Sequence, residues 1–147
     1  MKGLIQRVSE ASVTVDNERI GVIQTGLVLL LGVEREDDAS AARKLCRRIL
    51  TYRVFPDEQG RMNRSLTDTG GALLVVPQFT LAADTASGTR AGFSRAASPE
   101  SAETLYQLFV AEAKASLGGE HVAEGRFGAD MQVQLINDGP VTFLLEV

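Results

Sequence analysis

Gln78, Phe79 and Thr80 form a segment whose backbone is a candidate for catalysis. They follow an apolar run, residues 72–76, that has the composition of a buried strand. Where such a strand gives way to polar residues, its amide groups can point into a cleft instead of into a sheet. Two or three amides held in this way stabilise a developing oxyanion, and Thr80 adds a hydroxyl group. A strand end with a locally bonded threonine is the alternative interpretation of the same residues.

Gly139 and Pro140 form the second candidate segment. Glycine accepts backbone conformations that other residues avoid, and a peptide bond that precedes proline can be cis. Such a bond would turn two carbonyl groups in an unusual direction. A plain turn between two strands, predicted over residues 131–136 and 141–147, is the alternative.

The cysteine and histidine counts narrow the chemistry. The 147 residues include one cysteine, Cys46, and one histidine, His121, which excludes an internal disulfide and a Cys/His zinc site within one chain. His121 lies in a predicted loop, where a catalytic triad would need a specific third partner. The sequence has no dinucleotide fingerprint, P-loop or nucleophile elbow. We therefore expect no metal, no cofactor and a reducing, cytoplasmic location.

A basic helix face is the main candidate for contact with nucleic acid. Apolar residues recur at three- and four-residue spacing between positions 42 and 50, which predicts an amphipathic helix with Asp37 and Asp38 available to cap it. The opposite face carries four basic residues, Arg43, Lys44, Arg47 and Arg48. A solvated polar face is the plainer interpretation, and phosphate contact is the alternative. The net charge of −4 argues against generic binding to nucleic acid.

The elements that would position these residues indicate one mixed α/β domain over residues 1–147. Runs of β-favouring residues predict strands over residues 4–8, 11–15, 20–23, 27–33, 72–76, 131–136 and 141–147. A second helix is predicted to begin at Ser98-Pro99 and to end at Gly118. This order indicates a mixed sheet or open, β-barrel-like sheet with two main helices. The longest apolar run is too short to span a membrane, and the first residues are unlike a secretion signal.

Four motifs together resemble the D-aminoacyl-tRNA deacylase family, also called D-tyrosyl-tRNA deacylases. In chain order they are Gln6-Arg7-Val8 with Ala11-Ser12-Val13, Pro77-Gln78-Phe79-Thr80-Leu81, Gly125-Arg126-Phe127-Gly128-Ala129-Asp130-Met131 and Asn137-Asp138-Gly139-Pro140-Val141-Thr142. Each motif is weak alone, but their joint order is highly specific. The resemblance runs from the first strand to the C-terminus.

The resemblance implies a homodimer with the deacylase fold and an active site at the subunit interface, where the ester bond of D-aminoacyl-tRNA is hydrolysed. It implies that Gln78, Phe79 and Thr80 surround the scissile ester. It also implies that Gly139-Pro140 reaches into the partner's pocket and screens the chirality of the amino acid, while Arg7 helps to hold that motif. The other implied substrate-binding positions are Pro77, Met131 and Asn137. Glycyl-tRNA has no side chain to exclude and is expected to be cleaved too.

The sequence departs from the family pattern at Pro77, where the family has a serine. Proline supplies neither that hydroxyl nor a backbone N–H. Catalysis would then depend on the amides of Phe79 and Thr80, on orientation, and on the neighbouring ribose 2′-OH of the tRNA. Two other function classes fit the residues: a catalytically weak dimeric module that binds tRNA or DNA, and an esterase that acts on a small acyl substrate.

Overall fold

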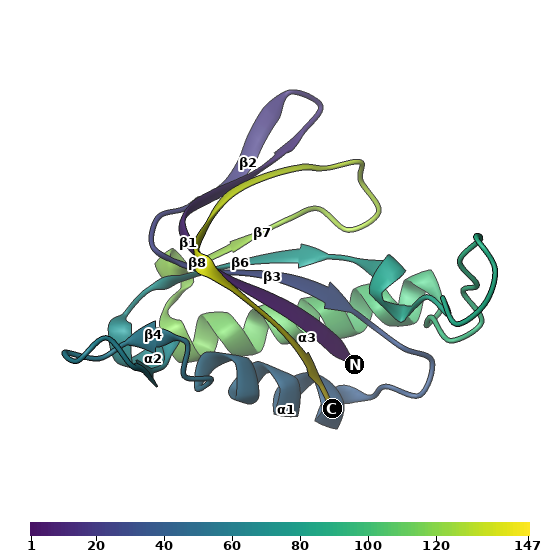
Figure 1. Cartoon of the computed structure of the whole chain (residues 1–147). Coiled ribbons are helices and arrows are strands. Elements are labelled where there is room, and N and C mark those ends of the chain that lie inside the picture. The colour runs from purple at the N-terminus through teal and green to yellow at the C-terminus, as the bar shows by residue number, and fades with distance from the viewer.

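Two strands that are buried on both faces form the centre of the sheet. The computed structural model describes residues 1–147. In it, β3 (Gly26–Gly32) pairs in parallel with β6 (Ala72–Pro77), and most of their residues are buried, as their apolar runs predict. β1 (Lys2–Val15) lies antiparallel to β3 on its other side. Figure 1 shows these strands between the helices and the β2 hairpin.

The sheet curls almost into a barrel. Its order is β2-β1-β3-β6-β7, with β2 (Glu18–Ile23) at one end and β7 (Val122–Glu124) at the other. A Cβ atom on Gly21 of β2 would lie 3.2 Å from the carbonyl oxygen of Glu124 in β7, so the two ends come close together. The long strand β8 (Gln132–Glu146) pairs antiparallel with β1. The predicted mixed α/β fold with a barrel-like sheet is confirmed.

Two long helices cover one face of this sheet (Figure 1). α1 (Ala39–Leu50) begins after Asp38, whose side chain accepts a hydrogen bond from the Ala41 amide at 2.8 Å. α3 (Pro99–Leu117) begins after Ser98, as predicted. Both helices bury an apolar stripe in a cluster of 24 core residues, while a second cluster of 7 residues fills the other side of the sheet. No helix combines the length and the apolar character needed to cross a bilayer.

Some boundaries differ from the sequence prediction. The strands predicted over residues 4–8 and 11–15 form one strand, β1, and those predicted over residues 131–136 and 141–147 form one strand, β8. The prediction of a plain turn between residues 131–136 and 141–147 is therefore wrong. β8 runs through both ranges and pairs with β1 on either side of irregularities in register. The structure also contains short elements beyond the main pattern: β4 (Phe55–Pro56), β5 (Met62–Arg64), α2 (Leu66–Thr69), η1 (Phe79–Ala82) and η2 (Gly119–His121).

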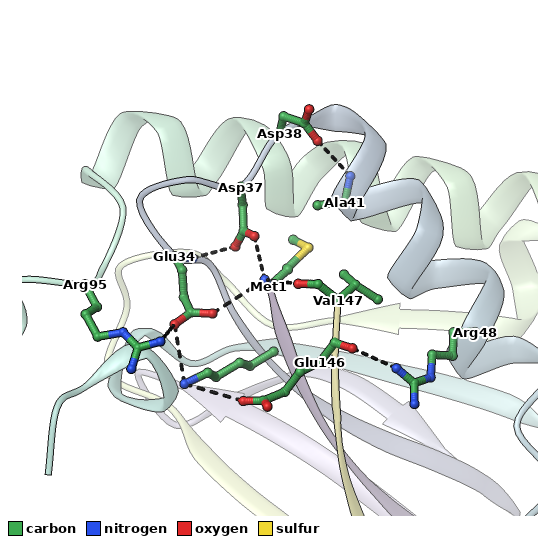
Figure 2. Close-up of polar contacts among 10 residues, drawn as sticks. Met1, Glu34, Asp37, Asp38, Ala41, Arg48, Arg95, Glu146 and Val147 are labelled. Atoms are coloured by element: carbon green, nitrogen blue, oxygen red, sulfur yellow. Dashed lines mark hydrogen bonds and ion pairs between the residues drawn. The ribbon is translucent and has the colours of Figure 1, made fainter. Parts of the chain in front are cut away.

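The two chain ends meet beside α1 (Figure 2). The buried ammonium group of Met1 donates to the Asp37 carboxylate and to the carbonyl oxygen of Val147. Glu34 forms an ion pair with the same ammonium group at 3.6 Å and another with Arg95 at 3.2 Å. Asp37 is thereby committed to the chain end, and Asp38 alone caps α1.

Candidate active site

The end of β6 presents two backbone amides that have no acceptor. β6 ends at Pro77, which lacks an N–H group, and the amide of Gln78 donates to a carbonyl oxygen of β3 at 2.8 Å. The chain then enters η1, where Leu81 is the first residue to donate, to the carbonyl oxygen of Gln78. The amides of Phe79 and Thr80 precede this bond and have no partner elsewhere in the chain. Two adjacent free donors therefore lie at the strand end.

The side chains of Gln78 and Thr80 bond to each other at this point. Nε2 of Gln78 donates to Oγ1 of Thr80 at 2.6 Å, so the hydroxyl proton of Thr80 is free to point outward. The Phe79 ring is 61% exposed and packs against Phe93 with 5.1 Å between ring centroids. The strand end can thus present two amides and one hydroxyl group to a ligand. Thr80 has no hydrogen bond to a base that would make it a nucleophile.

Residues 125–131 lie directly against this strand end. The amide of Gly125 donates to the carbonyl oxygen of Val75 at 2.8 Å. A Cβ atom on Gly125 would lie 2.8 Å from Sδ of Met131 and 3.2 Å from Cδ of Pro77, so this close packing requires glycine. Pro77 and Met131, two of the predicted substrate-binding residues, therefore lie together beside the free amides.

Arg7 holds a second segment, residues 137–142, which we call the Gly-Pro segment. Its Gly139–Pro140 peptide bond is cis. Nε of Arg7 donates to the carbonyl oxygen of Asp138 at 2.9 Å, and Nη1 donates to the carbonyl oxygen of Val54 at 2.6 Å. The Arg7 side chain is only 13% exposed. The arginine thus ties the Gly-Pro segment to the residues after α1.

The side chain of Asn137 forms two hydrogen bonds within the Gly-Pro segment. Its Oδ1 accepts from the Val141 amide at 2.7 Å, and its Nδ2 donates to Oγ1 of Thr142 at 2.9 Å. Gly139 has a φ of 144°, and a Cβ atom there would lie 2.6 Å from Cγ2 of Val141. Gly139 and Pro140 are both exposed, so the Gly-Pro segment lies on the surface of the chain.

The strand end and the Gly-Pro segment lie apart within one chain. Pro77 lies opposite Leu31 of β3, and Leu31 pairs with Gly3 of β1. The Gly-Pro segment lies beside Arg7, four residues farther along β1, which corresponds to about 13 Å at about 3.3 Å per residue. In the hydrogen-bonded order of the sheet, β1 and β3 also lie between β8 and β6. One chain does not bring both segments into one pocket.

The four basic residues of α1 differ in their surroundings. Nε of Arg43 binds Oε1 of Glu112 at 2.9 Å, and Nη1 of Arg48 donates to the carbonyl oxygen of Glu146 at 2.7 Å. Lys44 and Arg47 are exposed. Their side chains form neither a hydrogen bond nor an ion pair, so both cations are unpaired.

Cys46 and His121 lie outside both segments. Burial raises the pKa of the Cys46 thiol to about 12, and the charge of Glu112 adds to this effect, so the thiol stays protonated in the core. His121 is half-exposed and lies 3.7 Å from a carboxylate oxygen of Glu120. No three His, Cys, Asp or Glu side chains are grouped in a way that would hold a metal ion.

Comparison with known proteins identifies the family. The sequence profile of the D-Tyr-tRNA(Tyr) deacylases matches residues 4–146. The chain belongs to this family. The D-aminoacyl-tRNA deacylase of Marinobacter nauticus is 68% identical over 99% of this chain and 94% of the relative. The D-aminoacyl-tRNA deacylase of Stutzerimonas stutzeri is 61% identical over 99% of both chains.

Two solved structures resemble this member of the deacylase family. The c-Myc DNA unwinding element binding protein has a TM-score of 0.96 and 40% identity, covering 100% of this chain and 99% of the other. A probable eukaryotic D-amino acid tRNA deacylase has a TM-score of 0.83, covering 99% of this chain and 98% of the other; at 17% identity it shows the fold alone. The family resemblance seen in the four motifs is confirmed.

Sequence reasoning missed Tyr106 among the residues of this deacylase-family chain that shape the site. Its place in an apolar stripe predicts a core residue, and it is 1% exposed. Its hydroxyl group, however, lies within hydrogen-bond distance of the carbonyl oxygens of Val75 and Gly125. Burial, and next the charge of Glu124, raise the pKa of Tyr106, which keeps this hydroxyl protonated and able to donate.

Proposed function

We propose that this chain hydrolyses the ester bond of D-aminoacyl-tRNA and releases a free D-amino acid and tRNA. Membership of the deacylase family supports this activity. The observation that carries it is the pair of unpartnered amides at Phe79 and Thr80. Such donors stabilise the negative oxygen that forms when water attacks an ester carbonyl.

In this mechanism, orientation and oxyanion stabilisation replace a strong base. Water adds to the carbonyl carbon, and the carbonyl oxygen becomes an oxyanion that accepts from the amides of Phe79 and Thr80. The oxyanion then re-forms a carbonyl group, the bond to the ribose oxygen breaks, and that oxygen takes up the proton that the attacking water has lost. We assign proton transfer to the ribose 2′-OH beside the ester, because Thr80 has only Gln78 as a hydrogen-bond partner. An aminoacyl ester is labile enough for such modest assistance.

The pocket that we propose is completed by a second copy of the chain. In a homodimer, the Gly-Pro segment of one subunit would face the strand end of its partner. The two segments could then share a pocket although they lie about 13 Å apart along the sheet of one chain. The 15-residue strand β8 pairs only with β1, which leaves its other edge free for contact between subunits. Ile136 and Leu144, both on β8, are 55% and 52% exposed.

Chiral selection in this pocket would work by exclusion. The Gly-Pro segment is held by Arg7 and Asn137, so it can occupy the space that an L side chain needs. A D side chain would point away, and glycine would pass because it has none. We therefore propose that D-aminoacyl-tRNA and glycyl-tRNA are cleaved, while L-aminoacyl-tRNA is spared. The substrate and the single free thiol, Cys46, support a cytoplasmic location.

Substitution of Phe79 gives a direct test of the amide pair. Phe79→Pro removes one of the two donors, and proline suits this position because it is the first of η1 and Gln78 before it is not helical. We expect release of D-Tyr from D-Tyr-tRNA to slow by about 100- to 1000-fold. Phe79→Ala removes the same exposed ring but keeps the amide, so it serves as the matched control. Equal rates for the two variants would contradict the assignment.

A binding module without catalysis is the second candidate. Two observations favour it: the similarity to a DNA unwinding element binding protein, and the free cations of Lys44 and Arg47 on α1. The wild-type protein separates the candidates when it is incubated with D-Tyr-tRNA and with a free D-Tyr ester. Binding of the tRNA without release of D-Tyr would favour the module. Equal hydrolysis of both compounds would favour an esterase for small acyl substrates.

A further inference from the structure

Tyr106 is the point at which the helical layer contacts the candidate active site through hydrogen bonds. It lies on α3, and its side chain is 1% exposed in the core under the sheet. Its hydroxyl group is 3.1 Å from the carbonyl oxygen of Val75 and 3.0 Å from that of Gly125. One hydroxyl proton is thus shared between two carbonyl groups that belong to different segments.

Both of those segments carry residues of the site. Val75 lies two positions before Pro77, where β6 ends and the free amides follow. Gly125 begins the segment that brings Met131 beside Pro77. The Gly125 amide also donates to Val75 at 2.8 Å, so the strand end and residues 125–131 meet at one small group of hydrogen bonds.

Packing around Tyr106 leaves this contact little freedom. The Phe127 ring lies 6.1 Å from the Tyr106 ring and is tilted by 46° to it, so residues 125–131 also rest on the tyrosine. On the other side, Pro77 and Met131 leave no room for a side chain on Gly125. A shift of residues 125–131 would therefore be transmitted to Pro77 and onward to η1.

We propose that Tyr106 is a positioning residue for deacylation, which holds residues 125–131 at a fixed distance from the amides of Phe79 and Thr80. This inference rests on the proposed function. The tyrosine does not touch the reacting atoms. It acts through the carbonyl groups of Val75 and Gly125, and its role is to keep the end of β6 and residues 125–131 in fixed positions relative to each other.

Tyr106→Phe tests this role because it removes the hydroxyl group and keeps the ring that packs the core. Tyr52→Phe is the matched control: it changes the chain's other tyrosine, which packs against Phe143 at 5.5 Å and forms no hydrogen bond through its hydroxyl group. With D-Tyr-tRNA we expect kcat of Tyr106→Phe to fall by about tenfold, with KM changed by less than about twofold. Tyr52→Phe should match the wild type in both.

Hydrogen exchange at the Gly125 amide gives a second readout that needs no substrate. This amide donates to Val75, and loss of the tyrosine hydroxyl should speed its exchange in Tyr106→Phe but not in Tyr52→Phe. Faster exchange with an unchanged kcat would mean that Tyr106 has only a structural role, and would overturn the proposal. Unchanged exchange would overturn it too. A wild-type protein that cannot cleave D-Tyr-tRNA would refute the proposed function instead, whatever the exchange rates are.

Discussion

Replacement of Arg7 by lysine should separate the position of the Gly-Pro segment from the rest of the fold. The guanidinium group contacts two carbonyl oxygens at once, that of Asp138 at 2.9 Å and that of Val54 at 2.6 Å. Lysine keeps the charge but has no planar fork that reaches both. A hydrogen bond from a charged donor contributes about 1.5–3 kcal/mol when its partner cannot turn to water.

Only one of the two bonds should contribute fully to stability. Val54 is fully buried, so its carbonyl would stay unpaired, whereas Asp138 is exposed and water can replace the arginine there. We therefore expect Arg7→Lys to lose about 2 kcal/mol of unfolding free energy, roughly 4–8 °C in Tm for a chain of this size. Displacement of the Gly-Pro segment should lower kcat/KM on D-Tyr-tRNA by about 100-fold.

The assay compares thermal unfolding and release of D-Tyr for Arg7→Lys, the wild type and Arg19→Lys. Arg19 lies on β2, and its exposed side chain forms no hydrogen bond or ion pair, so its replacement controls for the change of side chain alone. Wild-type activity in Arg7→Lys, at a temperature where the protein is folded, would refute the claim that this arginine positions the Gly-Pro segment.

Three further predictions concern other parts of the molecule. Charge reversal of Lys44 and Arg47 to Glu should weaken tRNA binding and flatten its salt dependence, because the side chains of both residues are exposed and unpaired. Unchanged binding and an unchanged salt dependence would favour a merely solvated face. Treatment with EDTA should leave the deacylation rate unchanged, since we assign the chemistry to backbone amides; a loss restored by a divalent ion would contradict this. Asp37→Asn should lower Tm, because it weakens the buried ion pair with the Met1 ammonium; an unchanged Tm would show that the pair adds no net stability.

Local patterns in the sequence were sufficient for the main elements. The apolar runs that became β3 and β6 are buried on both faces, and Asp38 and Ser98 cap the helices. These features depend on residues close in sequence, namely periodicity, caps and turn residues. The same local signals located the strand end and the Gly-Pro segment as candidate sites.

Long-range pairing decided what local patterns could not. β8 continues through Gly139-Pro140 because it stays paired with β1 through two shifts in register, and such shifts depend on the partner strand. The sequence made Asp37 available as a helix cap, but in the structure its carboxylate pairs with the Met1 ammonium instead. Tyr106 has the spacing of a core residue, and only the three-dimensional structure shows which carbonyl groups its hydroxyl group contacts.

Subunit complementation tests the account most directly, because its central claim is that each pocket combines the strand end of one subunit with the Gly-Pro segment of the other. Phe79→Pro impairs the first, and Gly139→Ala impairs the second, since a Cβ atom there would lie 2.6 Å from Cγ2 of Val141. Each variant alone should be nearly inactive on D-Tyr-tRNA. After unfolding and refolding of an equal mixture, half of the dimers are mixed and each holds one intact pocket, so we predict recovery of about a quarter of wild-type activity. No recovery, with mixed dimers present, would mean that each pocket is built within a single subunit and would contradict the account.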